Sequence, residues 1–173
     1  MSVILSESAC VCEWHMKDSL KTGISFGLTS GVITTLGLMV GLHAGTHSRI
    51  VVLGGILTIA VADALSDAMG IHLAEESKNS GSAKHVWEST VTTFVAKLCI
   101  ALTFAVPVFL FPLQLAIVLS VLWGLLLLAL LSFILARAQR TNPWKVVGEH
   151  LVIALCVVAV THAVGDWVQG LKE

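Results

Sequence analysis

Two acidic residues, Asp63 and Asp67, stand four positions apart inside a long apolar run. In a helix this spacing places both carboxylates on one face, with Ser66 beside them. A carboxylate at the centre of a bilayer costs about 2.5 to 3.5 kcal/mol on insertion scales, so two on one face need a compensating cation or protons. The pair is therefore a candidate cation or proton site. The alternative is a structural pair that only forms hydrogen bonds with neighbouring helices.

Three further ionisable residues within apolar runs are candidates for chemistry. Lys97 lies about eight residues into its run and is a candidate counter-ion for Asp63, Asp67 or Asp166, unless its ammonium snorkels to the membrane surface. As a counter-ion it would compete with a metal or help to move protons. His162 and Asp166 are again four apart, near the end of the last apolar run. They either line an exit from the membrane or sit in the wet interface.

The first apolar run contains glycines at intervals of four. They form two stripes: Gly23, Gly27 and Gly31, then Gly37, Gly41 and Gly45. Such stripes let helices approach closely in lipid, where packing drives association, so we expect this helix to contact a second copy of the chain in a homodimer. Ser30 and Thr34 share part of the stripe. Their hydroxyls could supply oxygen ligands to a site between helices, or bond back to their own helix.

An acidic mouth is expected where the second apolar run ends. It comprises His72, Glu75, Glu76 and Glu88. These side chains could collect cations at a cytoplasmic entrance, although charged residues at a helix end also simply mark the membrane interface.

Soft metal ligands are concentrated near the N-terminus in Cys10, Cys12 and His15. A tract of Cys and His can capture zinc or iron, but a fourth matched ligand is missing. Thiols exposed on an interfacial helix are the alternative. Two further cysteines, Cys99 and Cys156, lie inside apolar runs, so the four together do not form a disulfide framework.

These residues must be positioned by membrane-spanning helices. The 173-residue chain is 56% hydrophobic and 12% charged, about half the charge usual for a soluble domain. The excess apolar surface must face lipid, which makes the lipid bilayer the first partner. A formal charge of −1 gives no basic face for nucleic acid. No nucleophile elbow, phosphate loop or HExxH motif occurs, so we do not expect an enzyme.

Five spans are predicted, forming a single all-α transmembrane domain over residues 1–173. They are placed near 22–44, 50–73, 89–111, 113–136 and 147–169. Residues 1–21 precede them as a cytoplasmic segment without a signal peptide. Seven cations fall on the side of this segment and two on the other. The positive-inside rule then predicts a cytoplasmic N-terminus and an outside or lumenal C-terminus.

The order of these features resembles the vacuolar iron transporter family. The resemblance rests on three stretches, FGLTSGVITT at 26–35, ADALSDAMG at 62–70 and THAVG at 161–165. The resemblance covers the five-span plan and is most specific in the first two helices. It implies a homodimer that exports Fe²⁺ or Mn²⁺ from the cytosol in exchange for protons, along a path between the subunits.

The chain departs from the family pattern at several positions. The family's Asp-Gly is here Ser30-Gly31, its methionine in the second helix falls on Asp67, and its following glutamate is Ile71. The family's long cytoplasmic metal-binding domain is reduced to the 15 residues at 74–88. The resemblance therefore implies a position on the transport pathway for Ser30 and Asp67 only.

The sequence thus predicts a proton-coupled divalent-cation transporter with no permanently bound cofactor. Its metal site is expected to comprise Asp63, Asp67 and Ser30, completed by the same residues of a second subunit. Carboxylates in place of a thioether favour harder ions, while iron and manganese come from the resemblance. A non-transporting membrane scaffold with the same fold is the alternative. A passive channel is a third possibility.

Overall fold

The computed structural model describes residues 18–78 and 82–171, and every element in them is helical. The helices are α1 (Asp18–Thr46), α2 (Arg49–Ser77), α3 (Ala83–Thr103), α4 (Ala105–Leu110), α5 (Leu113–Ala138) and α6 (Pro143–Gly170). Counting Ala83–Leu110 as one span, five of them are long and apolar enough to cross a membrane. The prediction of five spans is confirmed, although the helices extend a few residues beyond the expected limits. Cys10, Cys12 and His15 lie outside the described residues.

The third span differs most from its expected range. It begins at Ala83 rather than 89, because the Ser82 side chain accepts a hydrogen bond from the His85 backbone N–H and caps the helix. It then breaks at Phe104, between α3 and α4. Pro107 lacks the N–H that would bond to the carbonyl four residues earlier, which accounts for the break.

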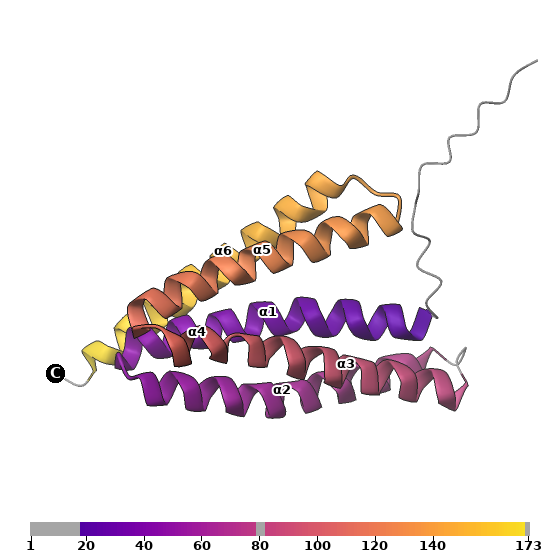
Figure 1. Cartoon of the computed structure of the whole chain (residues 1–173). Coiled ribbons are helices and arrows are strands. Elements are labelled where there is room, and N and C mark those ends of the chain that lie inside the picture. Colours follow the sequence, from indigo (N-terminus) through magenta and orange to yellow (C-terminus); the bar gives the residue numbers. More distant parts are fainter. Residues whose placement is uncertain (1–17, 79–81, 172–173) are drawn as a thin grey trace, which may run out of the picture.

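Helix α1 runs through the middle of the bundle, with α2 and α3 against one side and α5 and α6 against the other (Figure 1). Its glycines explain this position. A Cβ atom on Gly27 would lie 2.7 Å from the carbonyl oxygen of Thr93 in α3, and one on Gly45 would lie 3.2 Å from that of Gly165 in α6. The first stripe therefore packs against α3 and the second against α6. The stripes thus serve packing within the chain, and contact of this helix with a second copy stays a prediction.

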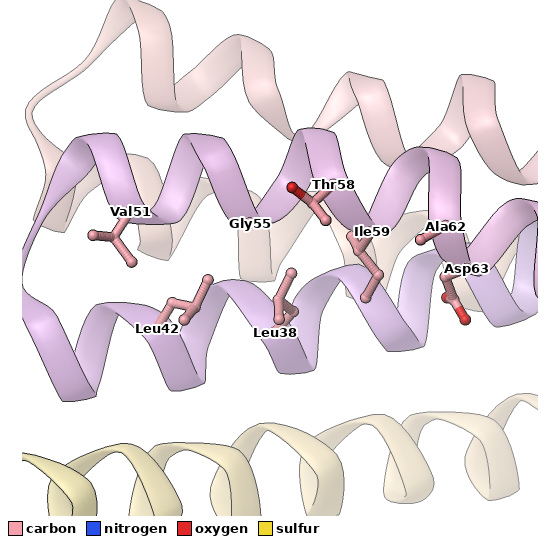
Figure 2. A pocket seen from close by; sticks show the side chains of 8 residues that line it. All are labelled: Leu38, Leu42, Val51, Gly55, Thr58, Ile59, Ala62 and Asp63. Carbon is pink, nitrogen blue, oxygen red and sulfur yellow. The ribbon is translucent and has the colours of Figure 1, made fainter.

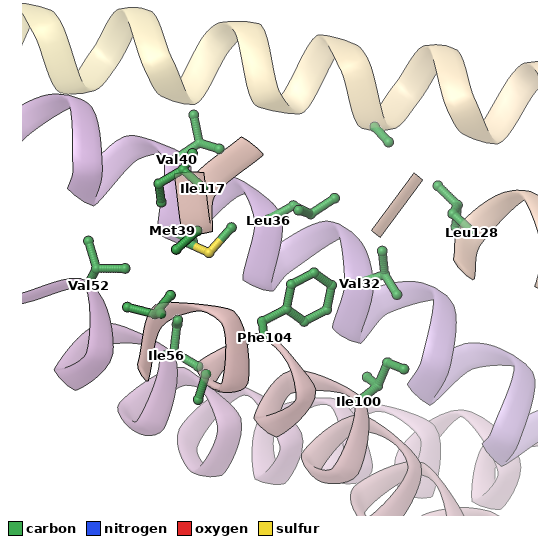
Figure 3. Packing of buried hydrophobic residues seen from close by; sticks show 14 residues of the cluster. Val32, Leu36, Met39, Val40, Val52, Ile56, Ile100, Phe104, Ile117 and Leu128 are labelled. Atoms are coloured by element: carbon green, nitrogen blue, oxygen red, sulfur yellow. The ribbon is translucent and has the colours of Figure 1, made fainter. Parts of the chain in front are cut away.

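The buried apolar cluster forms around the break in the third span (Figure 3). Phe104 is fully buried and lies among Val32, Leu36 and Met39 of α1 and Ile56 of α2. The break thus places an aromatic ring where three helices meet. In lipid this close packing, rather than removal of apolar surface from water, holds the helices together.

Six cations lie at one end of the bundle, where α1, α3 and α6 begin and where α2 and α5 end (Figure 1). They are Lys21, Lys78, Lys84, Arg137, Arg140 and Lys145. We call this the basic end. Arg49 is the cation of the described residues at the opposite end. Within the described residues, the cations that were predicted to share one side of the membrane thus lie at the same end of the bundle.

The α1–α6 contact makes a prediction about stability. A Cβ on Gly165 would collide with the backbone carbonyl of Gly41, so Gly165→Ala should lower the free energy of unfolding by about 1 to 3 kcal/mol. Gly148→Ala on the same helix meets nothing within 4 Å and should be neutral or slightly stabilising. Thermal unfolding in detergent measures both variants. Equal melting temperatures would contradict the close approach of α1 and α6.

Candidate functional site

An ion cluster lies inside the helix bundle, centred on the ammonium of Lys97. The Lys97 Nζ lies 2.5 Å from Oδ2 of Asp63, contacts Oδ2 of Asp67, and donates to the Ser30 hydroxyl at 2.9 Å. The Ser30 hydroxyl in turn donates to Oδ2 of Asp67 at 2.6 Å. Of the three N–H donors of the ammonium, two have hydrogen-bond acceptors, on Ser30 and Asp67, whereas the buried Asp63 Oδ2 lies within ion-pair distance and accepts no hydrogen bond. We call these four residues the Lys97 cluster.

The packing of α1, α2 and α3 brings the members of the Lys97 cluster together. Ser30 belongs to the α1 face that packs against α3, and its neighbour Gly31 leaves room for the lysine stem. A Cβ on Gly31 would lie 3.2 Å from Cγ of Lys97. Asp63 and Asp67 share one face of α2, as their spacing predicted. The glycine stripe of α1 therefore brings α3 close enough for Lys97 to reach Ser30, while the direct packing of α2 on α3 brings Lys97 to both carboxylates.

The structure decides between the alternatives for Lys97. Its side chain is 2% exposed, so the ammonium does not snorkel, and its partners are Asp63 and Asp67 rather than Asp166. The two carboxylates are more open, with 26% and 20% of their side chains exposed. With all three groups ionised the cluster carries a net charge of −1. In that state one carboxylate charge is left without a cation.

A groove runs between α1 and α2 and ends at the Lys97 cluster (Figure 2). It has a volume of about 640 Å³ and is lined from Val51, near the start of α2, to Asp63. Leu38 and Leu42 form its α1 wall. The groove therefore connects the opposite end of the bundle to a carboxylate in the middle of the span.

A stripe of small residues that was not predicted from the sequence borders this groove on α2. Every fourth residue is small and exposed, and the members are Gly54, Thr58, Ala62, Ser66 and Gly70. A Cβ on either glycine would meet nothing within 4 Å. The same spacing rule that drew attention to α1 would have found this α2 stripe. It is the small-residue face that no helix of the described chain covers.

The other candidate residues near the cluster have separate roles. The Thr34 hydroxyl donates to the Ser30 carbonyl at 2.9 Å, so it bonds back to its own helix. Ser66 is exposed on the α2 stripe rather than directed at Lys97. Of the hydroxyls considered, the structure brings only that of Ser30 into the Lys97 cluster.

The expected acidic mouth is divided in the structure. Glu75 is buried, its Oε1 lying 2.7 Å from Lys78 Nζ and its Oε2 3.4 Å from His85 Nε2. His72 Nδ1 lies 3.0 Å from the Thr90 hydroxyl. The remaining members are Glu76, which is exposed, and Glu88, which accepts from Ser19 at 2.9 Å. Glu75 and His72 thus hold α2 against α3. Glu76 is the exposed carboxylate of this group.

The expected exit pair lies at the opposite end. His162 Nδ1 is 3.1 Å from Asp166 Oδ2, and both side chains are more than half exposed. Two histidines that the sequence analysis did not single out, His43 and His47, also lie near the end of α1, with ring centroids 5.2 Å apart. Across residues 18–78 and 82–171, no three His, Cys, Asp or Glu side chains are placed to hold a metal ion as they stand. One chain alone therefore offers two carboxylates and a hydroxyl.

No family model, curated protein or solved structure matches this chain. The class that the geometry defines is a multi-pass helical membrane protein with a buried ion cluster.

Proposed function

We propose that this chain is a proton-coupled transporter of divalent metal cations and that the ion binds at Asp63 and Asp67, with Ser30 as a further ligand. The observation that carries the proposal is the Lys97 cluster. Two carboxylates are held in the middle of a membrane span beside a single ammonium, and one of them, Asp63, lines a groove. Ionisable side chains at this depth generally mark an ion or proton pathway.

A second copy of the chain completes the site in this proposal. A hard divalent ion takes about six oxygen ligands, whereas one chain offers two carboxylates and one hydroxyl. The uncovered α2 stripe supports contact between copies through α2, since small residues let helices approach closely in lipid. Two chains meeting there would bring four carboxylates together. The interface proposed here is therefore α2 and not the glycine stripes of α1.

The ligand chemistry favours hard ions. Carboxylate and hydroxyl oxygens suit Mn²⁺, Mg²⁺ and Ca²⁺, and the resemblance to the vacuolar iron transporters adds Fe²⁺. Lys97 acts as a tethered cation that occupies the carboxylates when no metal is bound. A divalent ion must compete with this ammonium and with any protons on the cluster, so metal binding is expected to release protons.

The test is uptake into proteoliposomes. We expect Mn²⁺ and Fe²⁺ to enter faster when a pH gradient is imposed than when it is absent. Liposomes without protein give the background, and dissipating the gradient with a protonophore should return uptake to the lower rate. Uptake that ignores the gradient would indicate a passive channel instead.

A non-transporting scaffold is the second candidate, and one observation favours it. The Lys97 ammonium lies within ion-pair distance of both carboxylates, so a cation already faces them without a metal. Proton release from the purified protein on addition of Mn²⁺ separates the two functions. A transporter should release protons as metal binds, whereas a scaffold has no reason to exchange them.

The α2 interface makes a prediction about assembly. Gly54→Leu and Gly70→Leu add side chains where the chain itself has open space, so the fold should survive while close contact between copies is blocked. We expect the dimer fraction in detergent, measured by light scattering, to fall several-fold. Gly148→Leu on α6, which also meets nothing within 4 Å, is the matched control. An unchanged dimer fraction in both α2 variants would exclude α2 as the interface.

A further inference from the structure

The turn between α5 and α6 concentrates positive charge at the basic end. Arg137, Arg140 and Lys145 are all exposed, and Glu149 Oε1 lies 4.0 Å from Lys145 Nζ. Residues 137–149 thus carry three cations and one acid, a net charge of +2. We call the three cations the basic cluster. Both members of the Lys145–Glu149 pair are mostly exposed, so the pair leaves the lysine available to another anion.

Aromatic side chains fix the position of this turn. The Arg137 guanidinium lies 5.3 Å from the centre of the Phe133 ring, and that ring lies edge-on to Trp144 at 5.8 Å. Trp144 itself is 75% exposed. Tryptophan is enriched at the level of lipid headgroups, which places the basic cluster at the same depth as the phosphates of the membrane.

A second groove leads from the basic cluster along the outer face of α6. It has a volume of about 550 Å³ and is lined by Trp144, Lys145, Gly148, Glu149, Val152 and Ile153. Gly148 forms an open floor, because a Cβ there would meet nothing within 4 Å. At 1.5 Å per residue, the groove runs about 13 Å along α6, close to the depth of one leaflet.

We infer that the α5–α6 turn binds an anionic phospholipid. The basic cluster takes the headgroup phosphate, and one acyl chain lies in the groove over Gly148, Val152 and Ile153. The charge of the turn selects an anionic headgroup, and the apolar groove on the outside of the bundle selects a lipid over a soluble anion. This inference does not depend on metal transport, because the site lies on α5 and α6 and uses none of the Lys97 cluster.

Fluorescence of Trp144 tests the inference directly. The other tryptophans, Trp14, Trp87, Trp123 and Trp167, are replaced by phenylalanine, and the full chain is reconstituted in phosphatidylcholine. Lipids with brominated acyl chains then quench Trp144 when they occupy the groove. Since a cation near the surface contributes about fivefold in affinity for anionic lipid, we expect brominated phosphatidylglycerol to bind at least about fivefold better than brominated phosphatidylcholine.

Two variants separate the headgroup from the acyl chain. Replacing Arg137, Arg140 and Lys145 by glutamine should bring the preference for phosphatidylglycerol close to one, whereas Lys84→Gln at the same end should leave it unchanged. Gly148→Leu fills the groove and should reduce quenching by brominated phosphatidylglycerol although the charges remain. The inference is overturned if the two brominated lipids quench Trp144 equally in the protein that retains the basic cluster. It is also overturned if inorganic phosphate abolishes the preference, which would mark a site for a soluble anion.

Discussion

Asp67→Asn is expected to lower Mn²⁺ uptake into proteoliposomes at least 10- to 100-fold. Loss of an outer-shell partner of a metal ligand already costs about this much, and Asp67 is proposed as a ligand itself. The amide keeps the size of the side chain and one oxygen to accept from Ser30 and Lys97, so the helices should stay packed. Size-exclusion chromatography in detergent checks that the variant is folded. The measurement is the initial uptake rate with an imposed pH gradient.

Variants at other positions show whether the loss of uptake is specific to the proposed site. Asp63→Asn should at least uncouple uptake from the pH gradient, and Asp18→Asn, at the exposed start of α1, should behave like the parent protein. Asp67→Met, which restores the residue of the resembled family, should shift the preference from Mn²⁺ toward softer ions. Parental uptake in the Asp63→Asn, Asp67→Asn double variant would place the path elsewhere, with His162 and Asp166 the next residues to test.

Lys97→Met should destabilise the protein by about 3 to 5 kcal/mol. It removes the ammonium and leaves two carboxylates inside the bundle without a cation, which is the costly way to break a buried ion pair. Unfolding in mixed detergent micelles measures the change. Lys84→Met, at an exposed position of the basic end, is the control and should cost little.

A triple variant shows whether charge is the cause. Adding Asp63→Asn and Asp67→Asn to Lys97→Met removes all the charges of the cluster, and most of the lost stability should return. Two results would contradict this explanation: Lys97→Met alone being as stable as the parent, or the triple variant recovering no stability. Either would show that uncompensated carboxylate charge is not the cause of the lost stability.

The five spans could be predicted because length and hydropathy are local properties of the sequence. The pairing of Asp63 with Asp67 followed from helical spacing, and the deep position of Lys97 made it a candidate partner. Which carboxylate it meets could not be derived, because that depends on how α2, α3 and α1 pack. In the structure Lys97 meets both carboxylates, and Gly31 of α1 leaves room for Ile100 and the lysine stem of α3.

That the glycine stripes pack within the chain could not be predicted either, for a related reason. A small-residue stripe predicts close helix contact but carries no information on whether the partner belongs to the same chain. Gly27 and Gly45 meet α3 and α6, while the uncovered stripe is on α2, where its residues include threonine, alanine and serine as well as glycine. The break at Phe104 likewise follows from Pro107, yet its consequence for the core needed the surrounding helices.

The arrangement of the Lys97 cluster also bears on how the chain enters the membrane. During synthesis α2 emerges first with both carboxylates, which at the bilayer centre would together cost about 5 to 7 kcal/mol on insertion scales. Their lysine follows on α3, and only residues 78–82 connect the two helices. A stable α2 therefore needs α3 beside it, so these two helices are expected to leave the insertion machinery as one hairpin, with the ion pair already formed between them.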